Sequence, residues 1–287
     1  MKRFIFVLTV ILIASAGVYN CKNSPENSSQ ELIGIQYGSD PINSFDISLP
    51  AGRTNQTPVI ILIHGGAWTG GDKSDFNYLR RFFCKKGFAV ASVNYRFANT
   101  RGGGFGHIID DISDAISLVR GKSDVWVYSR DLIIAAGHSA GGHIALMYGF
   151  TRGSGTFLRG VVSFCGVTDL TDFELQEMLR RMRINEAKSG GGAHDLIEFI
   201  TGGSREMQER YSPVYVTADV PVLLFSGKME TIIPWMQSVK LHEKMTGRGF
   251  DSTLYIYPDM GHDLSIHYTE IMSITEKWIR DRLANIK

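Results

Sequence analysis

The sequence predicts an α/β domain with a mostly parallel, eight-stranded sheet flanked by helices. Apolar runs rich in β-branched residues alternate along the chain with segments whose apolar residues recur at helical spacing. Val59–Ile63 is the clearest run, and its lack of any polar residue is typical of a strand buried on both faces. Alternating strands and helices form βαβ units with right-handed crossovers, and their active sites lie at the carboxyl ends of the strands.

The predicted elements begin near residue 31. Ile33–Tyr37 and Phe45–Leu49 flank the turn residues Gly38–Pro41 and predict a hairpin. The further predicted strands are Val59–Ile63, Phe88–Tyr95, Leu132–Ala136, Val161–Cys165, Pro221–Phe225 and Leu254–Tyr257. The predicted helices are Asp75–Lys86, Ile108–Val119, Ala140–Tyr148, Trp235–Met245 and Ser265–Leu283.

One stretch interrupts the alternation of strands and helices. Residues 171–210 contain no strand-like run, but they carry Arg180, Arg181, Arg183 and the glycines 190–192. Two interpretations stay open, a lid-like excursion over the sheet edge and a solvated charged helix with a flexible joint.

Composition narrows the classes of function. The 287 residues include 30 Lys and Arg against 29 Asp and Glu, so net charge gives no reason to expect nucleic acid or an anionic surface as a partner. The length suits one large α/β domain, which we place at residues 31–287. Cys84 and Cys165 are too few for a disulfide framework, and we expect both to be buried free thiols. We expect no metal site, because no His and Cys residues cluster at ligand spacing.

The first 21 residues have the features of an export signal. Lys2 and Arg3 precede the apolar run Phe4–Ala14, which is too short to be a membrane span. Cleavage after a small-residue site at residues 14–16 would release a soluble protein. Residues 18–21 instead resemble a lipobox, in which Cys21 would be lipidated and the polar residues 22–30 would form a tether. A buried N-terminal helix is the third interpretation.

The motif Gly137–Gly141 reads Gly-His-Ser-Ala-Gly. It follows the predicted strand Leu132–Ala136 directly and precedes a helix, which is the setting of a nucleophile elbow. The glycines allow a sharp turn that presents Ser139 as a nucleophile, and the helix that begins at Ala140 offers a free backbone N–H. The alternative is a glycine-rich turn with an incidental serine.

A second glycine motif follows the strand Val59–Ile63 and reads His-Gly-Gly-Ala-Trp. Glycines there let backbone N–H groups approach a tetrahedral intermediate, so we expect an oxyanion hole from Gly65, Gly66 and Ala140, with Ala67 as a further candidate. We expect a structural role for His64. Trp68 is either a wall of the substrate pocket or a packed aromatic residue, and we expect His138 to line the pocket as well.

The general base is expected in a loop after the last strand, and the acid that orients it after the strand before. His262 fits the first position, with His267 as runner-up. Glu230 fits the second position. The alternatives for the acid are Asp169, Asp259 and Asp263.

These stretches together resemble a known family. Residues 63–68, 71–73, 93–96, 137–145 and 211–213 are similar to the bacterial carbohydrate-esterase branch of the α/β-hydrolases, which includes bifunctional feruloyl and acetyl-xylan esterases. They are also similar to kynurenine formamidases and hormone-sensitive-lipase-like esterases. The resemblance covers residues 35–285 and implies a serine esterase. Two features depart from the family pattern: the acid is Glu230 where the family has Asp, and the excursion at residues 171–188 is longer than the usual connection.

The resemblance and the export signal together predict an exported serine esterase that acts on acetyl or feruloyl groups of carbohydrate through an acyl-enzyme. The alternatives are a general carboxylesterase, a kynurenine-formamidase-like amidohydrolase, a peptidase of related fold and a non-catalytic binding protein on the same scaffold.

We expect no cofactor, no nucleic-acid partner, and membrane contact only through a lipid at Cys21; the oligomeric state stays open. Gly102–Gly106 lacks the residues of a nucleotide-binding loop. Asp110 and Asp111 are expected in the first turn of their helix, where negative charge is favourable.

Overall fold

The computed structural model describes residues 25–99, 104–188 and 196–284. The predicted signal segment, the lipobox with Cys21, the glycines 190–192, and Gly102 and Gly103 of the glycine cluster at 102–106 lie outside these residues.

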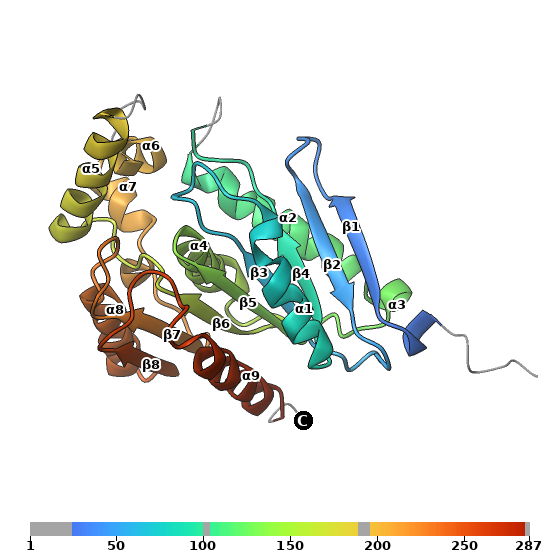
Figure 1. Cartoon of the computed structure of the whole chain (residues 1–287). Coiled ribbons are helices and arrows are strands. Elements are labelled where there is room, and N and C mark those ends of the chain that lie inside the picture. The colour runs from blue at the N-terminus through green and yellow to red at the C-terminus, as the bar shows by residue number, and fades with distance from the viewer. Residues whose placement is uncertain (1–24, 100–103, 189–195, 285–287) are drawn as a thin grey trace, which may run out of the picture.

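A single eight-stranded sheet forms the centre of the domain, with the strand order β1-β2-β4-β3-β5-β6-β7-β8 (Figure 1). The strands are β1 (Gln30–Gln36), β2 (Ser44–Leu49), β3 (Val59–Ile63), β4 (Ala89–Val93), β5 (Ile133–His138), β6 (Leu158–Phe164), β7 (Val222–Gly227) and β8 (Ser252–Tyr257). Strand β2 pairs antiparallel with both β1 and β4, whereas all pairs from β4 to β8 are parallel. The predicted hairpin and the mostly parallel sheet are confirmed.

Nine helices are described between and around these strands. They are α1 (Asn77–Lys85), α2 (Phe105–Gly121), α3 (Ser123–Trp126), α4 (Ala140–Tyr148), α5 (Phe173–Lys188), α6 (Leu196–Thr201), α7 (Arg205–Arg210), α8 (Met236–Gly247) and α9 (Tyr268–Ala284). The predicted helix Asp75–Lys86 is divided between a 3₁₀ turn at Lys73–Phe76 and α1.

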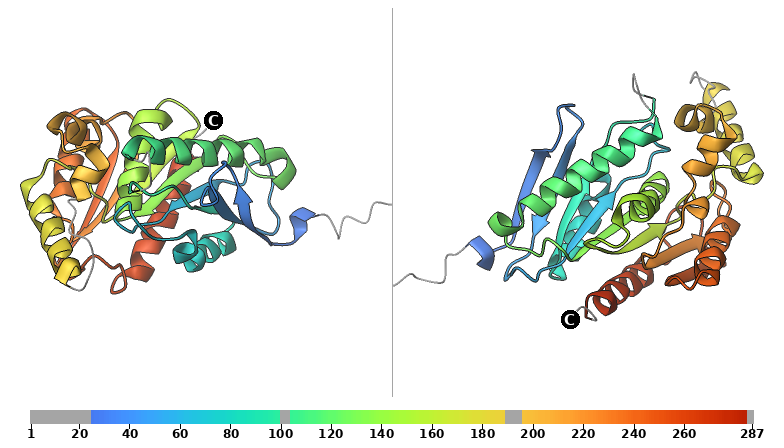
Figure 2. Two further views of the ribbon diagram at one scale, coloured as in Figure 1. Left: turned by 90° about the horizontal axis from the view of Figure 1, so that it is seen from above. Right: turned by 180° about the vertical axis from the view of Figure 1, so that it is seen from behind.

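Helices cover both faces of the sheet, as Figure 2 shows from above and behind. Successive strand side chains point to opposite faces, so Ile61 and Ile63 of β3 pack in one apolar cluster with α2 and α4. Ile60 and Leu62 pack in a second cluster, with α1 and α9. Burial on both faces explains why the sequence of this strand is uniformly apolar.

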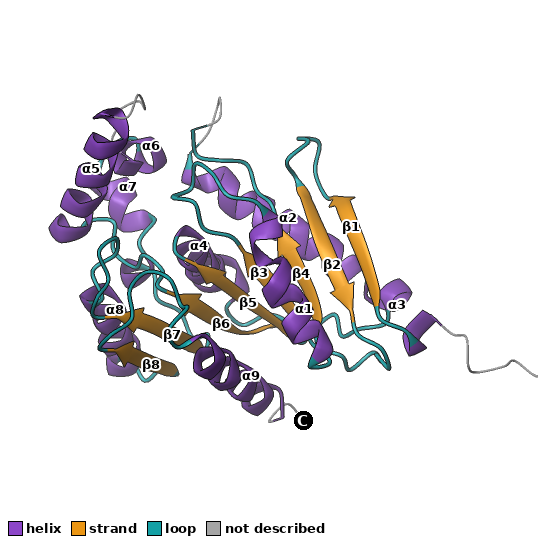
Figure 3. Ribbon diagram, in the orientation of Figure 1, coloured by secondary structure: helices purple, strands orange, loops and turns teal. Residues whose placement is uncertain are grey.

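The excursion at residues 171–210 consists largely of α5, α6 and α7, which stand together beyond the helical layers (Figure 3). The buried side chains of α5 and α6 include Leu175, Leu179, Leu196, Ile197 and Ile200. The exposed arginines Arg180 and Arg181 pair with Glu177. The stretch is therefore a packed helical cap, which combines an apolar inner side with a solvated charged side.

The described part of the predicted tether lies against the domain. The backbone N–H of Gly52 donates to the carbonyl of Glu26 over 2.7 Å. The buried guanidinium of Arg53 donates to the carbonyl of Ser28 over 2.8 Å and to the side chain of Gln30 over 3.0 Å. These bonds fix the chain from residue 26, so a free tether would be shorter than residues 22–30.

Two expectations about side chains were wrong. Helix α2 begins at Phe105, so Asp110 and Asp111 lie in its second turn rather than its first. Asp111 is buried and accepts bonds from the backbone and guanidinium of Arg96 and from Asn43, so its role is an internal ion pair. Cys84 is half-buried rather than buried, because the inner face of α1 runs through Leu79, Arg80 and Phe83; Cys165 is buried, and both thiols are free.

Within the described residues, no helix combines the length and the apolar character that crossing a membrane requires.

The close approach of α4 to β3 generates a prediction about stability. A methyl group on Gly141 would overlap with the backbone oxygens of Ile63 and His64, which cannot move without disturbing the sheet. We expect Gly141→Ala to lower the free energy of unfolding by about 3 kcal/mol or more. Urea denaturation measures this loss.

Gly121, the last residue of α2, provides the matched control. A methyl group there meets nothing within 4 Å. We expect Gly121→Ala to raise the free energy of unfolding by up to about 0.5 kcal/mol, because Ala favours the helix and restricts the unfolded chain. Equal effects of the two variants would contradict the steric argument.

Candidate active site

The turn between β5 and α4 holds Ser139 in a strained conformation, with φ 57° and ψ −124°. Such a backbone is costly for a residue with a side chain and persists only where the surroundings enforce it. A methyl group on Gly137 would overlap with the backbone of Gly141, and one on Gly141 with that of Ile63. The two glycines therefore permit a turn that no larger residues could make, and the turn presents Ser139 at the end of β5.

The loop after β3 lies directly against this turn. A Cβ atom on Gly65 would lie 3.1 Å from the carbonyl oxygen of His138 and 3.2 Å from Cβ of Ser139. The next three residues all have left-handed backbones, with φ 107° at Gly66, 51° at Ala67 and 60° at Trp68. The loop of Gly65 and Gly66 and the start of α4 are therefore the backbone segments beside Ser139, and Ala140 adds the first free N–H of α4.

Residues at the end of β4 hold this loop in place. The hydroxyl of Tyr95 donates to the carbonyl of His64 over 3.0 Å, and the His64 and Tyr95 rings stack 4.5 Å apart. The amide of Asn94 donates to Asp72 over 2.8 Å. His64 is fully buried, and burial lowers its pKa, so it is a neutral structural side chain. The stretches 71–73 and 93–96, which carry much of the family resemblance, form this support.

His262 and Glu230 meet between the loops that follow β8 and β7. Nδ1 of His262 lies 2.8 Å from Oε2 of Glu230. The backbone N–H of Met229 donates to the carbonyl of Met260 over 3.0 Å, which joins the two loops. A side chain on Gly227 would overlap with the backbone of Met260, so this glycine allows the loops to approach.

The Glu230 carboxylate is ionised in the folded protein at neutral pH. Burial by itself would raise its pKa, but the hydrogen bond and charge of His262, with the backbone N–H groups of Ile232 and Ile233, hold the pKa below its ordinary value. Because folding lowers the pKa of Glu230, its ionised carboxylate stabilises the folded protein. This stabilisation is fully present above the ordinary carboxyl pKa and is lost as pH falls through the lower pKa of the folded state.

The alternative candidates are engaged elsewhere. Nε2 of His267 lies 2.7 Å from Asp259, and its ring stacks on Tyr257. Asp263 accepts bonds from Ser265. Asp169 is fully buried and paired with Lys240. Of the four acids considered, Glu230 is the one bonded to His262.

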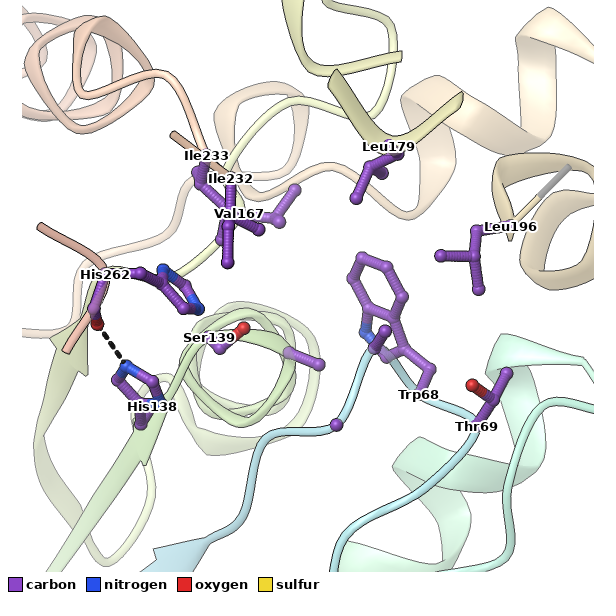
Figure 4. A pocket seen from close by; sticks show the side chains of 13 residues that line it. Trp68, Thr69, His138, Ser139, Val167, Leu179, Leu196, Ile232, Ile233 and His262 are labelled. Carbon is purple, nitrogen blue, oxygen red and sulfur yellow. Dashed lines mark hydrogen bonds between the residues drawn. The ribbon is translucent and has the colours of Figure 1, made fainter. Parts of the chain in front are cut away.

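His138 connects the nucleophile turn to the loop of His262. Its Nε2 lies 2.8 Å from the carbonyl oxygen of His262, so it donates a hydrogen bond there (Figure 4). Burial lowers the pKa of His138, and the nearby His262 lowers it further. The neutral ring of His138 therefore holds the backbone of His262 by donating a hydrogen bond, and His138 also lines the cavity.

A cavity of about 430 Å³ opens beside Ser139 and His262. Figure 4 shows both side chains at its edge, with Trp68 opposite. Trp68 is 1% exposed, so it is at once a packed aromatic residue and a wall of the cavity. Residues that sequence reasoning missed complete the lining: Thr69, Val167, Leu179, Leu196, Ile232 and Ile233. Two sequence features could have indicated these residues: the leucines within the charged excursion, and the apolar residues Ile232 and Ile233 close to Glu230.

Cys165 lies beside the acid. Its Sγ and the nearest ligand atoms of Glu230 and His262 all lie within 4.8 Å of one another, in the one group of described residues with donors suited to a metal ion. Glu230 and His262 use two of these ligand atoms for the hydrogen bond to each other. Burial and the neighbouring carboxylate raise the pKa of Cys165, which keeps it a neutral thiol.

Known proteins share this sequence and architecture. The chain is 26% identical over 258 residues to a probable isoprenylcysteine alpha-carbonyl methylesterase, ICMEL1, of Oryza sativa subsp. japonica, which covers 82% of the chain and 57% of that relative. It is 27% identical over 252 residues to the esterase LipC of Mycobacterium tuberculosis, covering 81% of the chain and 59% of that relative. The chain thus spans less than two thirds of the length of these relatives.

A solved structure has the same fold. A truncated carbohydrate esterase from gut microbiota superimposes with a TM-score of 0.73 at 20% identity, over 91% of this chain and 99% of that one. The predicted α/β-hydrolase fold is confirmed. The model of the BD-FAE family matches residues 45–245, from β2 to α8, and so includes the nucleophile turn, the glycine loop and Glu230. The chain is a member of the BD-FAE family.

Proposed function

We propose that this protein is a serine carboxylic ester hydrolase, with Ser139 as nucleophile, His262 as base and Glu230 as the acid that orients the base. One observation carries the proposal: Ser139, at a strained strand–helix turn, lines the same cavity as His262, whose far nitrogen is bonded to Glu230.

The reaction follows from the chemistry of these groups. With Glu230 bonded to Nδ1, Nε2 of His262 takes the Ser139 proton as Oγ attacks the ester carbonyl. Backbone N–H groups from Gly65, Gly66 or Ala67 and from Ala140 stabilise the oxyanion. His262 then returns the proton to the leaving alcohol. Water attacks the acyl-enzyme by the same route, which releases the acid and restores Ser139.

For the substrate we propose an uncharged ester, with acetyl or feruloyl groups on carbohydrate first. The cavity lining includes no Asp, Glu, Lys or Arg among the described residues, which favours a neutral acyl group. The structural neighbour that is a carbohydrate esterase supports the same class. A general small-ester carboxylesterase and a formamidase-like amidohydrolase are the alternatives, since the same groups would cleave either bond.

We further propose that the protein is exported, with residues 1–21 as signal and Cys21 as lipid-modified N-terminus. Support comes from the sequence: two basic residues, a short apolar run and a lipobox-like stretch. Cleavage after residue 16 to give a soluble protein is the alternative.

The first prediction on function concerns Ser139. We expect the full chain to hydrolyse 4-nitrophenyl acetate, and Ser139→Ala to lower kcat by about 10⁴-fold or more, because the acyl-enzyme cannot form. A fluorophosphonate probe should label the wild type and leave the variant unlabelled. Turnover that survives in the variant would contradict the assigned nucleophile.

Natural acyl groups are compared on the same preparation. Release of acetate from acetylated xylan and of ferulate from feruloylated arabinoxylan separates the carbohydrate classes from small esters. Turnover of 4-nitrophenyl acetate with neither polymer attacked would favour the general carboxylesterase.

The pair of Glu230 and His262 generates a second prediction. Glu230→Gln keeps the shape of the side chain but removes the charge that stabilises the imidazolium. We expect kcat to fall by about 10³- to 10⁴-fold at neutral pH. Glu230→Asp keeps the charge but shortens the reach, so its loss should be smaller. Equal activity of Glu230→Gln and wild type would exclude Glu230 as the acid.

Export is tested separately in a bacterial host fed with labelled palmitate. We expect the wild-type chain to carry the label in the membrane fraction. Cys21→Ala should lose it, because the modified thiol is absent. An unlabelled wild type that is released in soluble form would favour cleavage after residue 16.

A further inference from the structure

A fully buried histidine outside the proposed triad joins three parts of the active site. His143 lies in α4, and its backbone N–H donates to the carbonyl of Ser139 over 3.1 Å. Nδ1 of its ring lies 3.0 Å from the indole nitrogen Nε1 of Trp68. Nε2 lies 2.7 Å from the carbonyl oxygen of Tyr211, directly after the cap helix α7.

The two partners determine where the proton on this ring lies. An indole nitrogen only donates hydrogen bonds, so Nδ1 of His143 must accept and carries no proton. A backbone carbonyl only accepts, so Nε2 must carry the proton and donate. Protonation of Nδ1 would set two N–H groups against each other. Burial lowers the pKa of His143 to about 4, which agrees with a neutral ring.

Trp68 is the strained end of the proposed oxyanion loop. It has φ 60° and follows Gly66 and Ala67, whose backbones are also left-handed. A non-glycine residue is unfavourable in this region and needs support from its surroundings. The carbonyl of Trp68 accepts from Ala98 over 2.8 Å, and the indole N–H is held by His143. His143 thus connects the loop to the helix that begins beside Ser139.

We propose that His143 is a positioning residue that fixes the oxyanion loop relative to the nucleophile helix through the indole N–H of Trp68. The inference rests on the proposed ester hydrolysis, because the loop supplies N–H groups to the oxyanion there. His143 lies outside the cavity lining and acts through Trp68, whose neighbours Ala67 and Gly66 line the cavity. The second hydrogen bond of the ring, to the carbonyl of Tyr211, orients His143 and can be removed separately.

Two substitutions separate the two hydrogen bonds of the His143 ring. In His143→Asn the amide oxygen can take the place of Nδ1 and accept from Trp68. In His143→Gln the longer amide can take the place of Nε2 and donate to Tyr211, so the acceptor for Trp68 is lost. We expect His143→Gln to lower kcat for 4-nitrophenyl acetate by about 10- to 100-fold with KM changed less than about threefold, and His143→Asn to recover most of that loss.

Trp68→Phe provides the partner variant, because it removes the indole N–H and keeps an aromatic wall. We expect its kcat to fall as in His143→Gln, and the double variant to be no slower than the slower single variant. Equal losses in the Asn and Gln variants, additive losses in the double variant, or a change confined to KM would overturn the proposal. Melting temperatures measured alongside identify losses that come from unfolding.

One readout does not depend on turnover. A long-range ¹H–¹⁵N NMR spectrum of the histidine-labelled full chain should show His143 as the neutral tautomer protonated at Nε2, and the indole signal of Trp68 should shift in His143→Gln. A ring protonated at Nδ1 would overturn the inference. If wild type and Ser139→Ala both lack esterase turnover while the tautomer is as expected, ester hydrolysis fails and the Trp68–His143 contact stands.

Discussion

The site depends on one steric constraint, the contact of α4 with the ends of β3 and β5. Gly137 and Gly141 have no room for a side chain. A Cβ atom on Gly137 would meet the backbone of Gly141, and one on Gly141 would meet the backbone of Ile63 in β3. Their absence of Cβ lets the helix begin directly above the sheet, which forces Ser139 into a left-handed backbone. The same contact brings Ser139 against Gly65. Nucleophile and proposed oxyanion loop are therefore placed by one packing event.

Three neutral histidines hold this arrangement around the one histidine that we expect to transfer protons. His64 stacks on Tyr95, His138 donates to the backbone of His262, and His143 connects Trp68 to Tyr211 after the cap helix α7. Burial lowers the pKa of all three, so each keeps one donor and one acceptor near neutral pH. In His143 the neutral ring joins a donor, Trp68, to an acceptor, the carbonyl of Tyr211, without placing a charge in the core. These hydrogen bonds and the surrounding packing hold Ala67, Trp68 and Ser139 in their unfavourable backbone conformations.

The cap and the loop after β7 make the wall of the cavity apolar. Leu179 and Leu196 close the cavity from the cap, while Ile232 and Ile233 close it from the loop that carries Glu230. The backbone of that loop also donates to the Glu230 carboxylate over 2.9 Å. One loop thus orients the acid and forms an apolar wall, so the base operates beside a surface that suits an uncharged acyl group.

The βαβ order, the uniformly apolar strands and the two glycine motifs can be predicted from the chain alone, because local spacing and the positions of glycines are visible in it. The order of strands also predicts the turn and loops in which Ser139, Glu230 and His262 lie, but it left Asp169, Asp259, Asp263 and His267 as alternatives. Which of these acids is bonded to His262 is visible only in the folded chain, since a hydrogen bond between residues 230 and 262 depends on how two loops pack. The tertiary structure also placed Asp111 in an ion pair and His143 between Trp68 and Tyr211. Such partners lie 15 to 75 positions apart, and nothing in local spacing encodes them.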